Sequence, residues 1–135
     1  MAKRGAGLYL EIAPQWVWIG GGLYKPEPSE LQAIREHIAA EHKRLRRIVE
    51  TSAFKRTVGE LHGEQLRRVP RGFLASHPAA HYLRFRQFLA GREWPAAFAC
   101  DARFYPQVLA VFRQVAPLTR FLNEPLLKRP ADPLM

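Results

Sequence analysis

A run of four large apolar residues, Trp-Val-Trp-Ile at positions 16–19, constrains the fold more than any other stretch of this chain. Successive side chains of a strand point to opposite faces of its sheet, so both faces of this run carry large apolar groups. A strand of this kind needs cover on both of its faces. We therefore expect residues 16–19 to lie in a sheet that is covered on both sides.

A second strand is predicted just before this run. The apolar residues at positions 8, 10 and 12 alternate with residues of mixed polarity, and Pro14 and Gln15 follow as a turn. This pattern predicts an antiparallel β-hairpin. Because an isolated hairpin is marginal in water, we expect another segment or another copy of the chain to extend it into a small sheet. An unpaired edge invites a further strand, which predicts self-association through the hairpin edge.

Helical spacing prevails after the hairpin. Apolar residues three and four positions apart predict an amphipathic helix that begins near Ser29, where short polar and acidic groups suit a helix start. Two short helices should follow, separated near Thr51 and Ser52 and ending near Gly59. The basic run at residues 42–47 is either a solvated face of these helices or a ridge that contacts phosphate.

A further helix is predicted to begin at Ser76 or His77, since Pro78 is tolerated in a first helical turn. Its apolar pattern continues through Leu89, and Gly91 should end it. The residues that follow, 92–95, are then a connector or a short strand.

The longest helix is predicted to begin at Asp101, because apolar residues then recur at helical spacing as far as Leu122. Pro117 should kink or break this helix, and the chain from Pro125 onward is expected to be unstructured. Phe112 belongs to the apolar pattern, so truncating it to alanine should cost about 3 kcal/mol or more if it is buried.

These elements together predict an α+β fold, in which an N-terminal antiparallel β-hairpin, part of a small sheet, packs with four or five α-helices. With 135 residues, 47% of them hydrophobic, the chain has the size of one domain, which we place at residues 1–126 with a flexible tail at 127–135. The sequence has no apolar run long enough to cross a membrane, and no apolar signal-peptide block, so we expect a cytoplasmic protein without membrane contacts. Cys100, the single cysteine, excludes an internal disulfide and is expected to be buried or half-buried.

Positive charge exceeds negative charge in this chain. Lys and Arg number 21 against 12 Asp and Glu, which gives a formal net charge of +9. Such an excess attracts phosphate-rich partners, and most of it is arginine, which suits bidentate contacts with phosphate or carboxylate. The charge favours an anionic partner, either nucleic acid or an acidic protein surface. A basic proteome or a missing acidic segment explains the same charge equally well.

The segment at residues 63–77 has no helical period and holds Arg67, Arg68 and Arg71 within five positions. Loops held by a scaffold often carry binding groups, so this loop is the first place to expect an anion site. The alternative is a solvent-facing connector. His77 and His81 have the spacing of a metal-binding pair on a helix, but no third ligand is close by, and we predict neither a metal nor a cofactor.

Five short motifs occur in an order that resembles a known family. They are GLYLEI, IGGGLYKPEPSEL, LRRVPRGF, SHPAAHYL and VFRQVAPLTRFLN. In this order they resemble the C-terminal part of the bacterial family called domain of unknown function 2461. The resemblance covers residues 7–126, and its strongest pieces are GGGLYKPEP at 20–28, PRGF at 70–73 and the pair His77-Pro78. The name of the family assigns no activity, so the resemblance implies none.

One expected part of the family pattern is missing. The resemblance implies an upstream stretch of the form Arg-x-x-Arg-Asp-x-Arg-Phe, followed by Asp or Asn, Lys and Tyr, and this sequence does not contain it. Either the chain is a natural truncation that pairs with itself or with a partner, or it is a fragment of a longer product.

Two functions are compatible with these features. The first is a basic binding or interaction module, whose arginine loop and basic helix engage an anionic partner without catalytic residues. The second is a truncated portion of an enzyme domain that acts on a phosphorylated or carboxylated substrate. In that case Arg68, Arg71, His77 and Lys25 would line a pocket that the missing upstream residues complete. The sequence does not identify catalytic residues for the second function.

Overall fold

The structure is a computed structural model that describes residues 5–127. Its elements follow one another along the chain as β1 (Gly7–Ile12), β2 (Trp16–Leu23), α1 (Pro28–Ala40), α2 (His42–Val49), α3 (Ser52–Thr57), α4 (Ala80–Leu83), β3 (Phe88–Pro95), the 3-10 helix η1 (Ala96–Cys100) and α5 (Phe104–Leu127). The described residues thus form an antiparallel sheet of three strands and five α-helices, which confirms the predicted α+β class.

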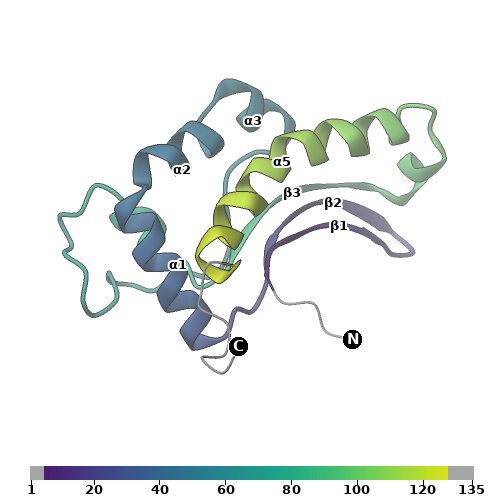
Figure 1. The fold of residues 1–135 in the computed structure, drawn as a ribbon. Helices are drawn as coiled ribbons and strands as arrows, with labels where there is room; N and C mark the ends of the chain where they lie inside the picture. Colours follow the sequence, from purple (N-terminus) through teal and green to yellow (C-terminus); the bar gives the residue numbers. More distant parts are fainter. Residues whose placement is uncertain (1–4, 128–135) are drawn as a thin grey trace.

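The hairpin forms as predicted, and a third strand extends it. The order in the sheet is β1-β2-β3, with β2 in the centre and antiparallel to both neighbours. The turn is closed by a hydrogen bond of 2.8 Å from the Ala13 amide to the Trp16 carbonyl oxygen. Figure 1 shows the three strands side by side, with the hairpin turn at the end of the molecule opposite α1 and α2.

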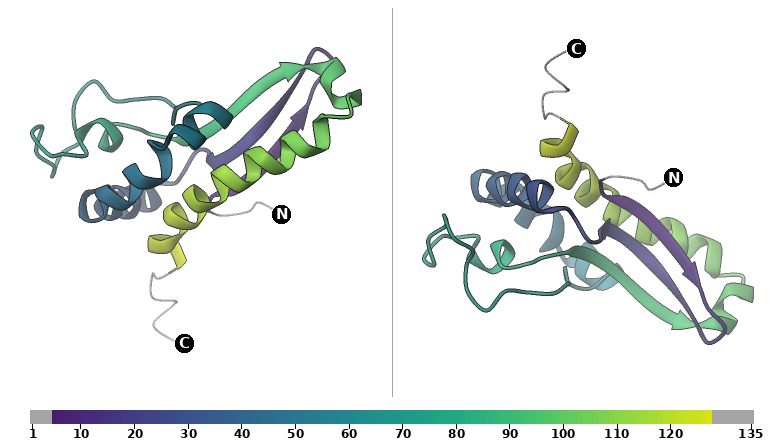
Figure 2. Two further views of the ribbon diagram at one scale, coloured as in Figure 1. Left: turned by 90° about the horizontal axis from the view of Figure 1, so that it is seen from above. Right: turned by 90° about the horizontal axis from the view of Figure 1, so that it is seen from below.

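The expectation that residues 16–19 are covered on both faces is wrong. Val17 and Ile19 are fully buried on the face that α5 covers, but Trp16 and Trp18 are only half-buried on the other face. Figure 2, seen from below, shows the strands lying in front of α5 with this second face open. The reason is local: Trp18 lies across the glycines of its own sheet, so it gains burial without a second layer.

The predicted helix through Leu89 is also wrong, because the chain from Phe88 forms β3. Phe88 and Ala90 are fully buried on the covered face, and Gly91 pairs with Gly20 of β2. A side chain at Gly91 would collide with Trp18, since its Cβ would lie 2.8 Å from Cε2 of the indole. The helix that precedes this strand is short, because α4 covers only Ala80–Leu83 and neither Ser76 nor His77 belongs to it.

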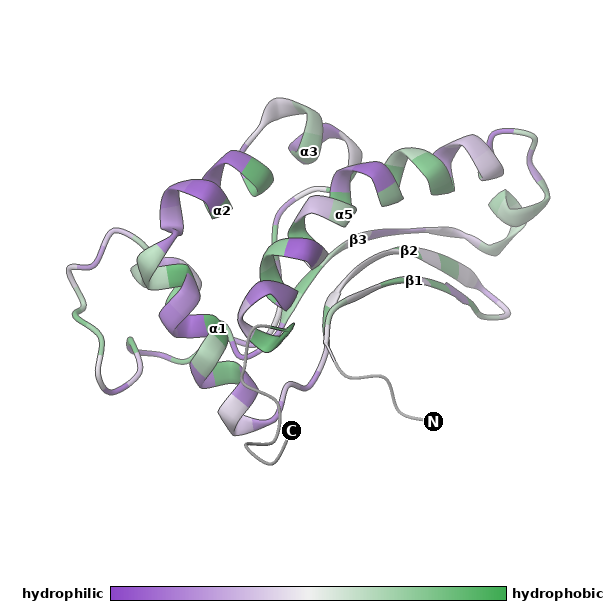
Figure 3. Cartoon of the chain, viewed as in Figure 1, coloured by the Kyte–Doolittle hydropathy of each residue, from purple (hydrophilic) through white to green (hydrophobic). Residues whose placement is uncertain are grey.

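The helices before the arginine loop form as predicted. Pro28 occupies the first turn of α1, and the Glu30 carboxylate accepts a hydrogen bond of 2.9 Å from the Glu27 amide. α2 and α3 are separated at Thr51, whose hydroxyl oxygen accepts from the Phe54 amide at 3.1 Å and starts α3. Figure 3 shows the hydrophobic residues of these helices interspersed with hydrophilic ones, as amphipathic helices require. Their buried residues join the covered face of the sheet and α5 in one core.

The last helix, α5, begins at Phe104, three residues after the predicted start at Asp101, and extends beyond the predicted end. It continues through Pro117 and Pro125 to Leu127, so Pro117 does not break it, although the ribbon changes direction in its second half (Figure 1). The expected flexible tail lies outside the described residues except for Leu127, which is helical. Cys100 is exposed, not buried. None of the helices in the described part of the chain is long and apolar enough to cross a membrane.

Candidate functional site

One candidate site is a basic end of the molecule, formed by α2 and by the loop at residues 67–79. α2 exposes Lys43, Arg46 and Arg47 to solvent, whereas its buried residues are apolar. Arg46 and Arg47 lie in the last turn, where cations are stabilised by the helix dipole. All the views show the loop at the end of the molecule that holds α1 and α2 (Figures 1 and 2).

Arg44 of α2 has a structural role. Its guanidinium donates hydrogen bonds to both carboxylate oxygens of Glu124 on α5, at 2.9 Å and 2.5 Å. It also lies 3.3 Å from a carboxylate oxygen of Glu41. The hydrogen bonds that Arg44 donates to Glu124, the largest effect, and to Glu41 hold the pKa of Arg44 above its usual value. Arg44 therefore ties α2 to α5 and is already paired.

Arg46 connects α2 to the loop. Its Nη2 donates to the Pro78 carbonyl oxygen at 2.7 Å, and its Nε lies 3.9 Å from a carboxylate oxygen of Glu50. The Tyr82 hydroxyl donates a short hydrogen bond to the same carboxylate. Burial first, and then this hydrogen bond, raise the pKa of Tyr82. The start of α4 and the end of the loop are thereby held against α2.

The loop is anchored at both ends. The Leu66 amide donates to the Arg84 carbonyl oxygen at 2.7 Å, and Arg84 Nε donates back to the Leu66 carbonyl oxygen at 2.9 Å. At the other end, the ring of His77 meets the ring of His42 edge-on, with centroids 5.6 Å apart. Phe73, in the middle, packs half-buried against the core. Anchors of this kind give an exposed loop a defined position.

The arginines predicted as anion ligands are on this loop. Arg67, Arg68 and Arg71 are all exposed, and in residues 5–127 no carboxylate lies within salt-bridge distance of them. His77 is half-buried, and its Nδ1 accepts a hydrogen bond of 2.9 Å from the Ala79 amide. That bond leaves Nε2 as the protonated nitrogen of a neutral ring. His77 therefore supports the loop, while the three arginines are available.

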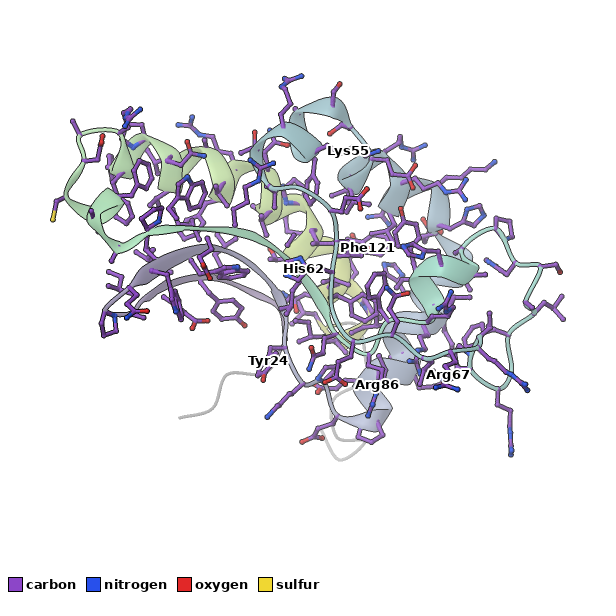
Figure 4. The ribbon with its side chains drawn as sticks, turned by 180° about the vertical axis from the view of Figure 1, so that it is seen from behind. Tyr24, Lys55, His62, Arg67, Arg86 and Phe121 are labelled. Atoms are coloured by element: carbon purple, nitrogen blue, oxygen red, sulfur yellow. The ribbon has the colours of Figure 1, made fainter. Side chains whose placement is uncertain are left out.

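Lys25 lies apart from this group. Its Nζ is 5.2 Å from the centroid of the Tyr24 ring, and the residue lines a depression together with Glu64 and Arg86. Figure 4 labels Tyr24, Arg86 and Arg67, and it shows Arg67 toward the loop. Within the described range, no hydrogen bond, ion pair or ring contact joins Lys25 to the loop arginines.

A second candidate site is a hollow of about 520 Å³ on the open face of the sheet. Five of the residues that line it have aromatic rings, counting histidine, and two carboxylates come from the outer strands. The lining residues are Tyr9, Glu11, Trp16, Trp18, Tyr24, His62, Leu89 and Glu93. His62 comes from the segment that pairs with β3, through backbone hydrogen bonds of 2.7 Å and 2.8 Å with Leu89. Figure 4 shows Tyr24 and His62 beside the sheet.

The sequence did not predict this second site. Glu11, Trp18 and Glu93 are neighbours only across three strands, because Glu11 pairs with Trp18 and Trp18 with Glu93. The alternation of Glu11 with apolar residues was the one available signal, since it placed a carboxylate on the same face as Tyr9. The contribution of β3 had no such signal, because its first residues, through Gly91, were predicted to end a helix and residues 92–95 to be a connector or a short strand.

Within residues 5–127 there is no group of three or more His, Cys, Asp or Glu side chains that could hold a metal ion. His77 lies outside α4, so His77 and His81 do not lie on successive turns of one helix. The exposed ring of His81 contacts the rings of Tyr82 and Phe85.

The fold and these surfaces of residues 5–127 define a small α+β protein in which helices cover one face of the sheet. Residues 1–121 match the family described as "Conserved hypothetical protein (DUF2461)", and the chain belongs to that family. The resemblance found from the sequence motifs is thereby confirmed. A search of curated proteins and a search of solved structures gave no match.

Proposed function

We propose that this chain is a binding module whose basic end engages a phosphate-rich partner, with nucleic acid as the class to test first. The observation that carries the proposal is the position of five cations that make no hydrogen bond or ion pair within residues 5–127, on two segments that contacts hold together. These cations are Lys43, Arg47, Arg67, Arg68 and Arg71. Four of the five are arginines, which match the geometry of phosphate. Binding of this kind requires no catalytic group.

The contacts of the neighbouring cations support this assignment. Arg44 and Arg46 make the pairs that hold α2 to α5 and to the loop, so the structure uses them internally. Lys43 and Arg47 line a shallow depression together with Glu41 and His42. Charges without internal partners are the ones that release counterions when they meet phosphate, which makes binding depend on salt.

The prediction is that the chain binds labelled DNA or RNA with an affinity that falls steeply with salt. The triple variant Arg67→Gln, Arg68→Gln, Arg71→Gln should bind more weakly at low salt. It should also reduce the slope of log affinity against log salt by about 2 to 3, since each lost phosphate contact reduces it by about 1. Fluorescence anisotropy over a salt series measures both quantities.

A matched control removes the same number of charges elsewhere. Arg92, Arg103 and Arg113 are exposed and lie on β3, in the segment before α5 and on α5. Their triple glutamine variant should keep most of the affinity and of the salt slope. Equal losses in both triple variants would show that only net charge matters and would contradict a defined site. Binding to polyglutamate but to neither nucleic acid would instead identify an acidic protein as the partner class.

The enzyme alternative receives less support from the geometry. It requires Lys25 to line one pocket with Arg68, Arg71 and His77, but Lys25 lies in a depression beside Glu64 and Arg86. The larger hollow contains carboxylates, which repel a phosphorylated or carboxylated substrate. A binding module is therefore favoured over chemistry.

Self-association through the hairpin edge is part of the same proposal. β1 is an outer strand of the sheet, and Leu8, Leu10 and Ile12 on it are 40%, 42% and 66% exposed. We predict a dimer at high protein concentration and a monomer for Leu10→Lys, because an edge lysine opposes strand addition. Light scattering measures the mass, with Leu74→Lys on the loop as the control. A wild-type monomer at every concentration would contradict this prediction.

A further inference from the structure

The floor of the hollow on the open face of the sheet is the ring of Trp18, which lies on two glycines. A Cβ at Gly20 would lie 2.6 Å from Cη2 of Trp18, and one at Gly91 would lie 2.8 Å from Cε2 of the same ring. The indole of Trp18 therefore lies across these two glycines of neighbouring strands. An aromatic ring held flat on a sheet in this way offers its other face to a ligand, and Trp18 is only half-buried.

Carboxylates stand on both sides of this ring. Glu11 on β1 and Glu93 on β3 are each directly paired with Trp18 in the register of the sheet. Adjacent strands are about 4.8 Å apart, so the backbones of the two glutamates lie at roughly equal distances on either side of the Trp18 backbone, while the indole itself extends over Gly20 and Gly91. Both are exposed, and neither makes a hydrogen bond or an ion pair with another residue of the described range.

The charge of the hollow is opposite to that of the chain. Among residues 5–127, the lining of the hollow includes two carboxylates and no Lys or Arg, although the whole chain carries a formal charge of +9. Screening at physiological salt limits the reach of a surface charge to about 8 Å. The two carboxylates that line the hollow outweigh the ammonium of Lys25, whose Nζ lies 5.2 Å from the centroid of the Tyr24 ring. A ligand that fits these surroundings is positively charged.

The aromatic lining favours the same sign of charge. The faces of Trp and Tyr rings attract ammonium and guanidinium groups, and Trp does so most strongly. The chain contains one example, since Lys25 Nζ lies 5.2 Å from the centroid of the Tyr24 ring at the edge of this hollow. Tyr9, Trp16 and Trp18 are half-buried and line the rest of the hollow.

We propose that this hollow binds small organic cations. The ammonium or guanidinium group of the bound cation lies over the ring of Trp18, between Glu11 and Glu93. The apolar part of such a ligand contacts Tyr9, which pairs with Gly20 beside the indole and also lines the hollow. A volume of about 520 Å³ is in the range of small-molecule sites. This site is independent of the basic end, which takes the opposite charge.

The experiment follows the indole N–H signals of ¹⁵N-labelled protein by NMR during titration with choline and with agmatine. Choline supplies a quaternary ammonium group, and agmatine supplies a guanidinium group and an amine. The signal of Trp18, assigned with Trp18→Phe, should move and saturate. Trp94 is the internal reference, because it pairs with Val17 on the covered face and stacks on Phe98 with centroids 5.6 Å apart, so its signal should stay in place.

Three controls make the result decisive. The uncharged isostere of choline, 3,3-dimethylbutan-1-ol, should bind at least about tenfold more weakly than choline. The double variant Glu11→Gln, Glu93→Gln should weaken cation binding by a similar factor, whereas Glu36→Gln, an exposed carboxylate on α1, should leave it unchanged. Because glutamine has the shape of glutamate, the double variant should keep the thermal unfolding temperature of the wild type.

Several outcomes would overturn the proposal. Equal binding of choline and its uncharged isostere would show an apolar hollow without charge selectivity. Cation binding that survives the double variant unchanged would exclude the carboxylates, and binding of maltotriose in place of both cations would identify a carbohydrate platform. A Trp18 signal that moves with protein concentration and with no ligand would show that a second copy of the chain fills the hollow. No movement of Trp18 with either cation would remove the site.

Discussion

Replacing Gly22 with alanine is expected to prevent stable folding. Gly22 lies near the end of β2 with a φ of +124°, which L residues rarely adopt. A Cβ at this position would overlap the Phe88 carbonyl oxygen and lie 2.9 Å from the Phe88 carbonyl carbon. These are backbone atoms of the paired strand, so β2 and β3 would have to separate. We expect a loss of about 4 kcal/mol or more in the free energy of unfolding, a large part of the stability of a small domain.

Gly72 provides the matched control for this prediction. Its φ is +97°, but no atom lies within 4 Å of the position where a Cβ would be. Gly72→Ala should therefore show only the cost of the backbone conformation, about 1 kcal/mol. Urea unfolding followed by circular dichroism measures both variants. If Gly22→Ala is no less stable than Gly72→Ala, the close approach of β2 and β3 at this point is incorrect.

Local patterns were sufficient for the elements whose signals lie within a few residues. Alternation around Pro14 predicted the hairpin, because a strand pair joined by a tight turn is a local structure. The helix start at Pro28 and Glu30 and the break at Thr51 were also recognisable, since capping groups act on amides three residues away. In these places the local preference and the tertiary structure agree.

The third strand was not predictable in the same way. The residues around Phe88 and Leu89 follow a helical pattern of apolar positions that begins at Tyr82, and the short α4 uses only its first part. What makes this segment a strand is its pairing with β2, in which Gly91 and Gly20 lie side by side beneath Trp18. Pairing between residues about 70 positions apart in the chain depends on tertiary contacts, and these override local preference.

The dependence on tertiary contacts also explains why one candidate site was predicted from the sequence and the other was not. The loop arginines were found from the sequence because they lie within one short segment, and the structure leaves them exposed. The hollow requires three strands in one register, together with His62 from a further segment. The two tryptophans that form it were assigned to a fully covered sheet, since an indole was not expected to find its cover on glycines of the same sheet.

Truncating Phe121 to alanine is expected to cost about 3 to 5 kcal/mol in the free energy of unfolding. Phe121 on α5 is 1% exposed, and its ring centroid lies 4.4 Å from that of His37 on α1. The guanidinium carbon of Arg44 on α2 lies 5.3 Å from the same centroid. One ring thus joins α1 and α2 to α5, beside the Arg44 and Glu124 pair. Its loss would leave a cavity where these helices meet.

Phe112 is the control, and it also corrects an expectation from the sequence. It belongs to the apolar pattern of α5 but is only half-buried, so less apolar surface returns to water when it is truncated. Phe112→Ala should cost roughly half as much as Phe121→Ala. Urea unfolding of the two variants measures the difference. A Phe112 variant as unstable as the Phe121 variant would mean that α5 presents a different face to the core. In that case the helix would be rotated, and the Arg44 and Glu124 pair that positions the basic end would be lost with it.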